Sequence, residues 1–334
     1  MILRDRSGMA LLLTLLAVSF LVAVTVQLAS TVNWQMEAAH NLRDSVRLKA
    51  MVRSGLNLAR AALAADQRQN KFDSLDDEWN RLDPATLSSL FGRGKLSVRV
   101  VDQSGLLQVN ALVSQEKDGI KRRQQEKHQF DLWIRLLTSG RFAIESEDEA
   151  VVLVDSIKDW IDKDDEVRDH GAESAYYQGL DPPYSARNGP VEYPEELLLV
   201  RGMTRKLFYG DKEHAGLAEY LTIAGRDGKI NINTAPLGIL QALAPGITKE
   251  AAGELVDFRR QKRNLDLLAR PDWYRQVRDF PDDIVLNRNI VTVVSHCFLV
   301  AVTATSDDGM VRTGSGVIRR DDRRRQTLLY WKVE

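Results

Sequence analysis

A run of acidic residues between positions 159 and 173 offers the clearest chemistry in this sequence. Counted from Asp162 as position one, carboxylates fall at positions one, three, five and twelve, where the last is Glu173. These are ligand positions of the EF-hand calcium loop, whose twelfth residue binds through both carboxylate oxygens. Position six is Val167, where that loop needs a glycine for its sharp turn. We therefore expect no true EF-hand, and two interpretations stay open: a looser calcium-binding loop and a solvated acidic turn.

A second motif, Lys-Ile-Asn-Ile-Asn-Thr-Ala-Pro at 229–236, precedes a predicted helix pair. We expect Thr234 to cap the first helix, with Pro236 in its first turn. We expect Asn231 and Asn233 to hydrogen-bond to local backbone. With the Pro-Gly-Ile turn at 245–247, the stretch resembles the helix-hairpin-helix unit of competence-type DNA receptors.

A DNA-binding hairpin has two glycines, which let backbone N–H groups reach a phosphate. Here the second glycine is replaced by Thr248, and acidic residues share the second helix. The basic residues that could contact phosphates are Lys249, Arg259, Arg260, Lys262 and Arg263. A compact helical scaffold is favoured, and a membrane-anchored DNA receptor is the alternative function. Another basic run, Arg319, Arg320 and Arg323 to Arg325, is interpreted as a solvated hairpin flank.

Sequence signatures of catalysis are missing from this chain. The five histidines have no partner at metal-ligand spacing, and no Gly-x-Ser-x-Gly, P-loop or dinucleotide fingerprint occurs. Cys297, the only cysteine, can form no internal disulfide, and its apolar neighbours predict a buried strand thiol. The net charge of −1 gives no general attraction for nucleic acid. We expect a protein that is not an enzyme.

The N-terminal part of the sequence predicts one long helix, half in lipid and half in the soluble domain that contains these motifs. No charge falls between Arg6 and Glu37, and the almost purely apolar run from Met9 to Val26 would span about 27 Å as a helix, about one bilayer. The basic residues before it predict a cytoplasmic N-terminus. An amphipathic stripe over 48–63 indicates that the helix continues into a soluble domain.

Strand patterns lie at both ends of the remaining chain, with a helical block between them. Alternation over 96–100 and 107–111, with a turn at 102–105, predicts a hairpin. A charged linker is expected over 114–127, before helices at 130–137 and 149–161. Closing strands are predicted within 290–306, 310–319 and 326–333. The expected fold is α+β: a long N-terminal helix packed on an antiparallel sheet that carries a large helical insertion.

This arrangement resembles the type IV pilin and type II secretion pseudopilin family. A short basic leader ends in Gly8, directly before the apolar run. The resemblance implies that a prepilin peptidase cuts between Gly8 and Met9 and methylates Met9. Most members have glutamate at the fifth mature position, but this chain has Leu13, and an apolar residue there is typical of the K pseudopilins. The alternatives are a plain membrane anchor, with Leu13 facing lipid, and a secretory signal cleaved near Ala29.

The resemblance to the K pseudopilins covers nearly the whole chain. It implies a leader at 1–8, a transmembrane segment at 9–30, a pilin-like first part at 31–118, a helical insertion at 119–287 and closing strands at 288–334. The string DWIDxDxxxxxxGAExxYY at 159–177 is typical of these proteins, in which bound calcium is a family feature. The implied calcium ligands are Asp159, Asp162, Asp164 and Glu173, followed by Glu166 and Asp169.

The resemblance also implies a function in assembly. A minor pseudopilin of this kind caps or initiates the pseudopilus at its tip and so supports export of folded proteins across the outer membrane. The implied partners are the minor pseudopilins I and J, the pseudopilus, the prepilin peptidase and the inner membrane, and no nucleic acid is expected. The chain would cross the inner membrane once, with its N-terminus in the cytoplasm and its C-terminal domain in the periplasm. A large insertion should clash with any subunit stacked above it, which favours the tip.

Overall fold

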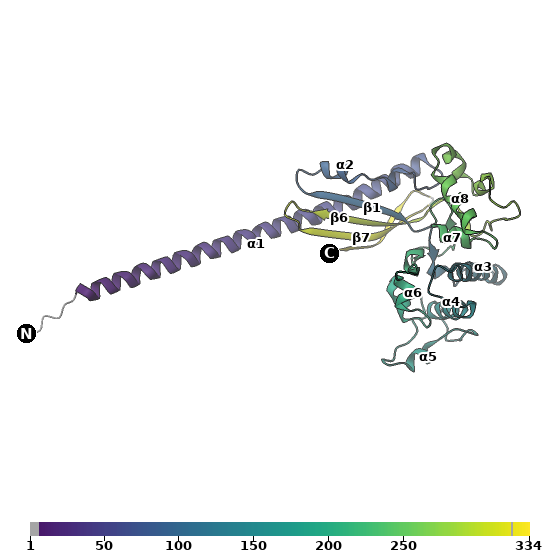
Figure 1. The fold of residues 1–334 in the computed structure, drawn as a ribbon, viewed down its shortest axis with the longest axis horizontal. Coiled ribbons are helices and arrows are strands. Elements are labelled where there is room, and N and C mark those ends of the chain that lie inside the picture. The colour runs from purple at the N-terminus through teal and green to yellow at the C-terminus, as the bar shows by residue number, and fades with distance from the viewer. Residues whose placement is uncertain (1–6, 322) are drawn as a thin grey trace, which may run out of the picture.

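The computed structural model describes residues 7–321 and 323–334, so most of the predicted leader lies outside the described residues. Its first element is one long helix, α1 (Ser7–Gln69), whose N-terminal half projects away from the rest of the molecule (Figure 1). That half is exposed along its length, including its apolar residues. It contains a segment long and apolar enough to cross a membrane.

The C-terminal half of α1 packs against a sheet. Its buried face consists of Leu48, Met51, Val52, Leu56, Ala59 and Leu63. These residues recur at helical spacing, which confirms the predicted amphipathic stripe. Gly55 lies where the helix approaches the sheet most closely, because a Cβ there would be only 2.5 Å from Cγ1 of Val302. A small residue at this point lets the helix and the sheet share one core.

The sheet has four strands in the order β1-β6-β7-β8, and all neighbouring pairs are antiparallel. These strands are β1 (Lys95–Asp102), β6 (Cys297–Thr305), β7 (Val311–Arg320) and β8 (Gln326–Val333). Between α1 and β1 lie the short helices η1 (Glu78–Asn80) and α2 (Pro84–Ser89). The predicted closing strands and α+β class are confirmed, and Cys297 is buried at the start of β6. We call the C-terminal half of α1, these short helices and this sheet the body.

The predicted hairpin over 96–111 is wrong. β1 pairs with β6, so that Val98 lies opposite Val302. The second half of the expected hairpin, β2 (Leu107–Gln108), pairs in parallel with the distant β3 (Leu221–Thr222). Local alternation showed which residues were extended, but it could not identify their partner strands.

Between β1 and β6 the chain forms a second unit, the helical unit, with its own hydrophobic core. Its elements are β2, η2 (Val109–Ala111), α3 (Gly119–Leu137), α4 (Glu147–Ile161), α5 (Ser174–Gln178), η3 (Pro194–Leu199), α6 (Arg205–Tyr209), η4 (Leu217–Tyr220), β3, β4 (Ile230–Asn231), α7 (Leu237–Ala242), α8 (Lys249–Arg260), η5 (Lys262–Ala269), η6 (Trp273–Gln276) and β5 (Val291–Thr292). We expected an insertion over 119–287, whereas apolar side chains from 107 to 293 pack into this core. Segments on both sides of the expected range therefore fold with the helical unit.

The charged stretch 114–127 is not only a linker, because the carboxylate of Asp118 caps α3 and the first half of that helix lies within the stretch.

The helical unit as a whole lies at the end of α1 opposite to the N-terminus (Figure 1). The bulk of the chain is therefore held far from the apolar segment.

Candidate metal centre and buried acidic junction

Three of the predicted ligands come together between α4 and α5. Asp159 lies in the last turn of α4, Asp162 directly follows that helix, and Glu173 directly precedes α5. One carboxylate oxygen from each residue lies within 4.8 Å of the other two, and all three residues are buried. We call these residues the carboxylate cluster.

Packing on both sides of the cluster fixes its position. The hydroxyl of Ser146 caps α4, and an apolar face of that helix is buried in the core. Trp160 packs edge-on against Tyr177, which ties the end of α4 to α5 with ring centroids 5.2 Å apart. Gly171 permits the loop to pass close to the cluster, because a Cβ there would lie 1.9 Å from Oδ2 of Asp159.

The charges of the cluster are only partly compensated. Nη1 of Arg168 donates to Oδ1 of Asp159 at 2.5 Å and also to Asp162. Both oxygens of Glu173 and Oδ1 of Asp162 are buried without a hydrogen-bond partner among the described residues. Burial, together with the negative charges of the two aspartates, raises the pKa of Glu173 to about 7. Unpartnered buried carboxylate oxygens are the ligands that a hard divalent cation takes, so the arrangement fits calcium, whose binding stays a prediction.

The other predicted ligands do not join this cluster. Asp164, Glu166 and Asp169 are exposed on the loop that follows α4. Oδ1 of Asp164 accepts a hydrogen bond from the backbone N–H of Glu166 instead. These side chains contribute negative potential around the cluster.

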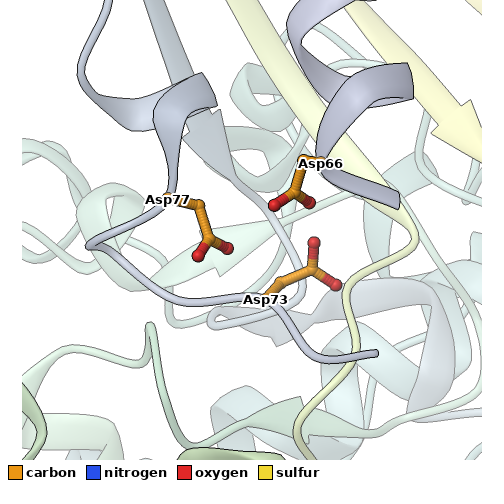
Figure 2. Close-up of side chains that lie close together, drawn as sticks. All are labelled: Asp66, Asp73 and Asp77. Atoms are coloured by element: carbon orange, nitrogen blue, oxygen red, sulfur yellow. The ribbon is translucent and has the colours of Figure 1, made fainter. Parts of the chain in front are cut away.

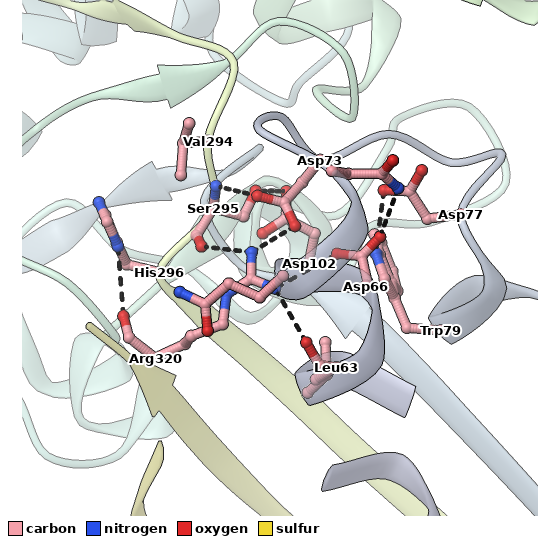
Figure 3. A network of polar contacts seen from close by, with 12 residues as sticks. Leu63, Asp66, Asp73, Asp77, Trp79, Asp102, Val294, Ser295, His296 and Arg320 are labelled. Atoms are coloured by element: carbon pink, nitrogen blue, oxygen red, sulfur yellow. Dashed lines mark hydrogen bonds and ion pairs between the residues drawn. The ribbon is translucent and has the colours of Figure 1, made fainter. Parts of the chain in front are cut away.

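A second group of carboxylates, which the sequence analysis missed, lies at the C-terminal end of α1 and in the segment that follows it. Asp66, Asp73 and Asp77 converge there (Figure 2). In contrast to the carboxylate cluster, this group has its own buried cation, because the guanidinium of Arg320 donates to both Asp66 and Asp73 (Figure 3). Asp77 accepts hydrogen bonds from Ser74 and from the indole of Trp79. These carboxylates thus have protein partners and need no metal.

Arg320 is also held by groups from the rest of the body. It donates to the backbone carbonyls of Leu63 and Ser295 (Figure 3). Its guanidinium lies 4.9 Å from the ring centroid of Phe298. Burial raises the pKa of Asp73 to about 7, although the charge of Arg320 opposes this rise. The end of α1, the strand β7 and the segment before β6 therefore meet at one guanidinium.

The helical unit joins the same network through its Asn-Thr motif. Thr234 and Ser295 donate to the buried carboxylate of Asp102 at the end of β1. Nδ2 of Asn231 donates to the Ser295 hydroxyl at 2.7 Å, and Nδ2 of Asn233 donates to the carbonyl of Asp73 at 3.1 Å. We call this network the junction; its members are Asp66, Asp73, Asp102, Asn231, Asn233, Thr234, Ser295 and Arg320. The prediction that Thr234 caps a helix is wrong, since α7 begins only at Leu237. The asparagines do not bond to local backbone alone, because they bridge distant segments.

In the helix pair α7 and α8, two residues considered for DNA binding make contacts inside the protein instead. Thr248, the residue in place of the second glycine, caps α8 through its hydroxyl. Arg259 is buried, and its Nη1 donates to the carbonyl of Ile232 at 2.8 Å. Its assignment as a phosphate contact is therefore wrong, because the side chain is used inside the protein. Lys249, Arg260, Lys262 and Arg263 are exposed.

The interpretation of the basic run at 319–325 was wrong at one position. Arg320 is buried, because it continues the core-facing alternation of Gly314, Gly316 and Ile318 along β7. Asp102 likewise continues the core-facing alternation of β1. A polar residue in step with the buried side of a strand was thus the signal that could have identified both residues.

Comparison with known proteins identifies relatives of this chain. Two family models described as "Type II secretion system (T2SS), protein K" match residues 105–210 and 230–284. The type II secretion system protein K of Aeromonas hydrophila is 32% identical over 235 residues, which are 69% of this chain and 68% of the relative. That of Pseudomonas aeruginosa is 28% identical over 270 residues, 77% of this chain and 73% of the relative.

A solved structure has the same fold. It is the crystal structure of the GspK-GspI-GspJ complex from the type 2 secretion system of enterotoxigenic Escherichia coli. The similarity has a TM-score of 0.64 at 18% identity and covers 89% of this chain and 99% of the related chain.

Removing the cation of the junction should lower the stability of the protein strongly, whereas removing the arginine next to it should not. In Arg320→Met, the carboxylates of Asp66 and Asp73 stay buried without their partner, so we expect a loss of about 3–5 kcal/mol in the free energy of unfolding. Arg319→Met removes the same charge from the exposed neighbouring position, and we expect a change within about 0.5 kcal/mol. Urea unfolding of the full-length variants in detergent, followed by circular dichroism, measures both. Equal midpoints for the two variants would contradict the role assigned to Arg320.

Proposed function

We propose that this chain, which belongs to the type II secretion system protein K family, acts as a minor pseudopilin at the tip of the pseudopilus. There it would cap or initiate the fibre and so support export of folded proteins across the outer membrane. Its contribution would be assembly rather than catalysis. The observation that carries the tip position is the location of the helical unit beyond the end of α1 (Figure 1).

The tip position follows from the way in which such helices stack. In a fibre built from parallel long helices, the next subunit would lie above the far end of α1. In this chain the helical unit lies at that end of α1 and extends to one side of it (Figure 1). A subunit with such a helical unit could lie above the other subunits of the fibre, but another subunit could not be stacked on top of it. The top of the fibre is therefore the position that the shape allows.

Partner subunits would contact the exposed part of α1 outside the membrane. Between the apolar segment and the body, this helix exposes large apolar side chains, including Trp34, Met36, Leu42 and Val46. Large apolar side chains exposed on a helix favour packing against other helices. GspK in the related solved structure is in complex with GspI and GspJ, and we propose the I and J pseudopilins as the partners here.

Assembly is tested by expressing the full-length chain with the I and J pseudopilins of the same organism. We expect a stoichiometric complex in detergent extracts, measured by size-exclusion chromatography with light scattering. Leu42→Gln combined with Val46→Gln should weaken it, because both changes remove exposed apolar surface from α1. Lys49→Gln, at an exposed polar position of the same helix, should leave the complex intact. Finding the unaltered chain only as monomers would count heavily against this function.

We also propose that the chain enters the fibre by the prepilin pathway. The peptidase would cut after Gly8 and methylate Met9, and α1 would cross the inner membrane once with the body in the periplasm. Leu13 supports a terminal position, because a subunit without the usual glutamate has no carboxylate to pair with the amino terminus of a neighbour.

Processing is measured by intact mass of the membrane-extracted protein, with and without co-expressed prepilin peptidase. We expect a peptidase-dependent loss of residues 1–8 and the gain of one methyl group. Gly8→Leu should retain the full N-terminus, because the cleavage site is altered while the apolar segment is kept. An unchanged mass would indicate a plain anchor, and cleavage near Ala29 would indicate an ordinary secretory signal.

We propose that the carboxylate cluster binds calcium. Asp159, Asp162 and Glu173 would supply oxygen ligands, which calcium prefers, and their buried oxygens that have no partner among the described residues would be available to it. The exposed Asp164, Glu166 and Asp169 lie outside the cluster, and we do not include them in the proposed ligand set. A bound divalent cation would offset the repulsion among three buried carboxylates and stabilise the connection between α4 and α5.

Calcium at a hundred times its dissociation constant should stabilise the protein by about 2.7 kcal/mol. Thermal unfolding by circular dichroism, in excess calcium and in chelator, measures this as a rise in melting temperature. Glu173→Gln should lose most of the rise, because it removes a buried ligand charge. Glu166→Gln makes the same chemical change at an exposed position of the same loop and should keep the rise. An equal loss in both variants, or no rise in the unaltered protein, would contradict the proposed ligand set.

A further inference from the structure

We propose that Arg168 occupies the place of the metal ion in the carboxylate cluster and must leave it when calcium binds, an inference that rests on the calcium site proposed above. Nη1 of Arg168 bridges Asp159 and Asp162, and its distance to Oδ1 of Asp159 is 2.5 Å. Calcium binds carboxylate oxygens at about 2.3–2.6 Å. A guanidinium nitrogen and a calcium ion that bridge the same two carboxylates therefore compete for the same position.

Arg168 compensates the cluster less completely than a divalent ion would. It carries one charge and reaches two carboxylates, while both oxygens of the third, Glu173, have no hydrogen-bond partner among the described residues. Calcium carries two charges and can bind all three carboxylates. Calcium would be the better counterion, but its apparent affinity would be reduced by the interactions of Arg168 that it has to replace.

The position of Arg168 in the fold allows such an exchange. Its side chain is 29% exposed, and it lies on the surface loop between α4 and α5. Arg320, the cation of the junction, is only 3% exposed and is enclosed by the body. Arg168 can therefore turn into solvent without disturbing a core. Calcium binding would thus be coupled to a change in the loop at 163–170, whose arrangement with Arg168 inside the cluster is the competing state.

The competition is measured by isothermal titration of calcium into the chelator-treated, full-length protein in detergent. In Arg168→Gln the competing cation is gone, so we expect calcium to bind on the order of tenfold more tightly than to the unaltered protein. Arg187→Gln is the matched control, because Arg187 has the same 29% exposure and also pairs with two carboxylates, Glu192 and Glu196. Arg187→Gln removes the same charge from the helical unit at a position outside the cluster. The affinity of this variant for calcium should stay close to that of the unaltered protein.

Three outcomes of the titration would overturn the inference, and they can be distinguished. If the unaltered protein binds calcium and Arg168→Gln binds it equally or more weakly, Arg168 does not compete with the ion. If Arg187→Gln gains as much as Arg168→Gln, the gain comes from general electrostatics. If the unaltered protein binds no calcium, the proposed calcium site fails, and this inference fails with it.

Urea unfolding gives an independent readout. In chelator, Arg168→Gln should unfold at a lower urea concentration than the unaltered protein, because the carboxylates lose their counterion. In saturating calcium the midpoints of the two proteins should coincide, because Arg168 no longer contacts the cluster in either. An equal destabilisation in chelator and in calcium would mean that Arg168 keeps its contacts when the ion is bound, which would overturn the proposal.

Discussion

The buried ion pairs of Arg320 with Asp66 and Asp73 connect α1 to the sheet. The guanidinium lies where the end of α1, the strand β7 and the segment before β6 meet, and it neutralises carboxylates that burial would otherwise disfavour (Figure 3). Around it, Asp102 at the end of β1 accepts hydrogen bonds from Thr234 and Ser295. Because the helical unit contributes Thr234 and two asparagines to this network, the same charge that closes the body also holds the helical unit in place.

This connection bears directly on the proposed position at the tip. A large insertion joined by a flexible linker could swing aside and let another subunit stack above it. Here the chain enters the helical unit from β1 and leaves it into the neighbouring strand β6. Asp102 at the end of β1 and Ser295 just before β6 are both members of the junction. The helical unit is thus tied by hydrogen bonds to Asp73, just after the end of α1, and in the proposed assembly its bulk would exclude a subunit from the space above that helix.

The two acidic groups of the molecule show how burial decides what a cluster of carboxylates can do. At the junction, a fully enclosed arginine satisfies the carboxylates, and the result is a permanent structural contact. In the carboxylate cluster the arginine is partly exposed, and one of the three carboxylates has no hydrogen-bond partner among the described residues, which is the basis of the proposed divalent-ion site. Similar residue types thus give an enclosed ion pair in one place and a partly exposed one, with unpartnered oxygens among the described residues, in the other.

The local features of this protein could be predicted from its sequence: the apolar segment, the amphipathic half of α1, the closing strands and the acidic run from 159 to 173. Each of these is encoded by periodicity or composition within a short window. The three-dimensional structure was needed to show that β1 pairs with β6, that Asp164 stays outside the cluster, that Arg259 is buried and that Arg320 pairs with Asp73. These facts depend on contacts between residues far apart in the chain, such as Arg320 with Asp73, and local patterns carry no information about partners at that distance. The alternation of β7 did mark Arg320 as facing the core, but the carboxylates that make its burial favourable come from other segments.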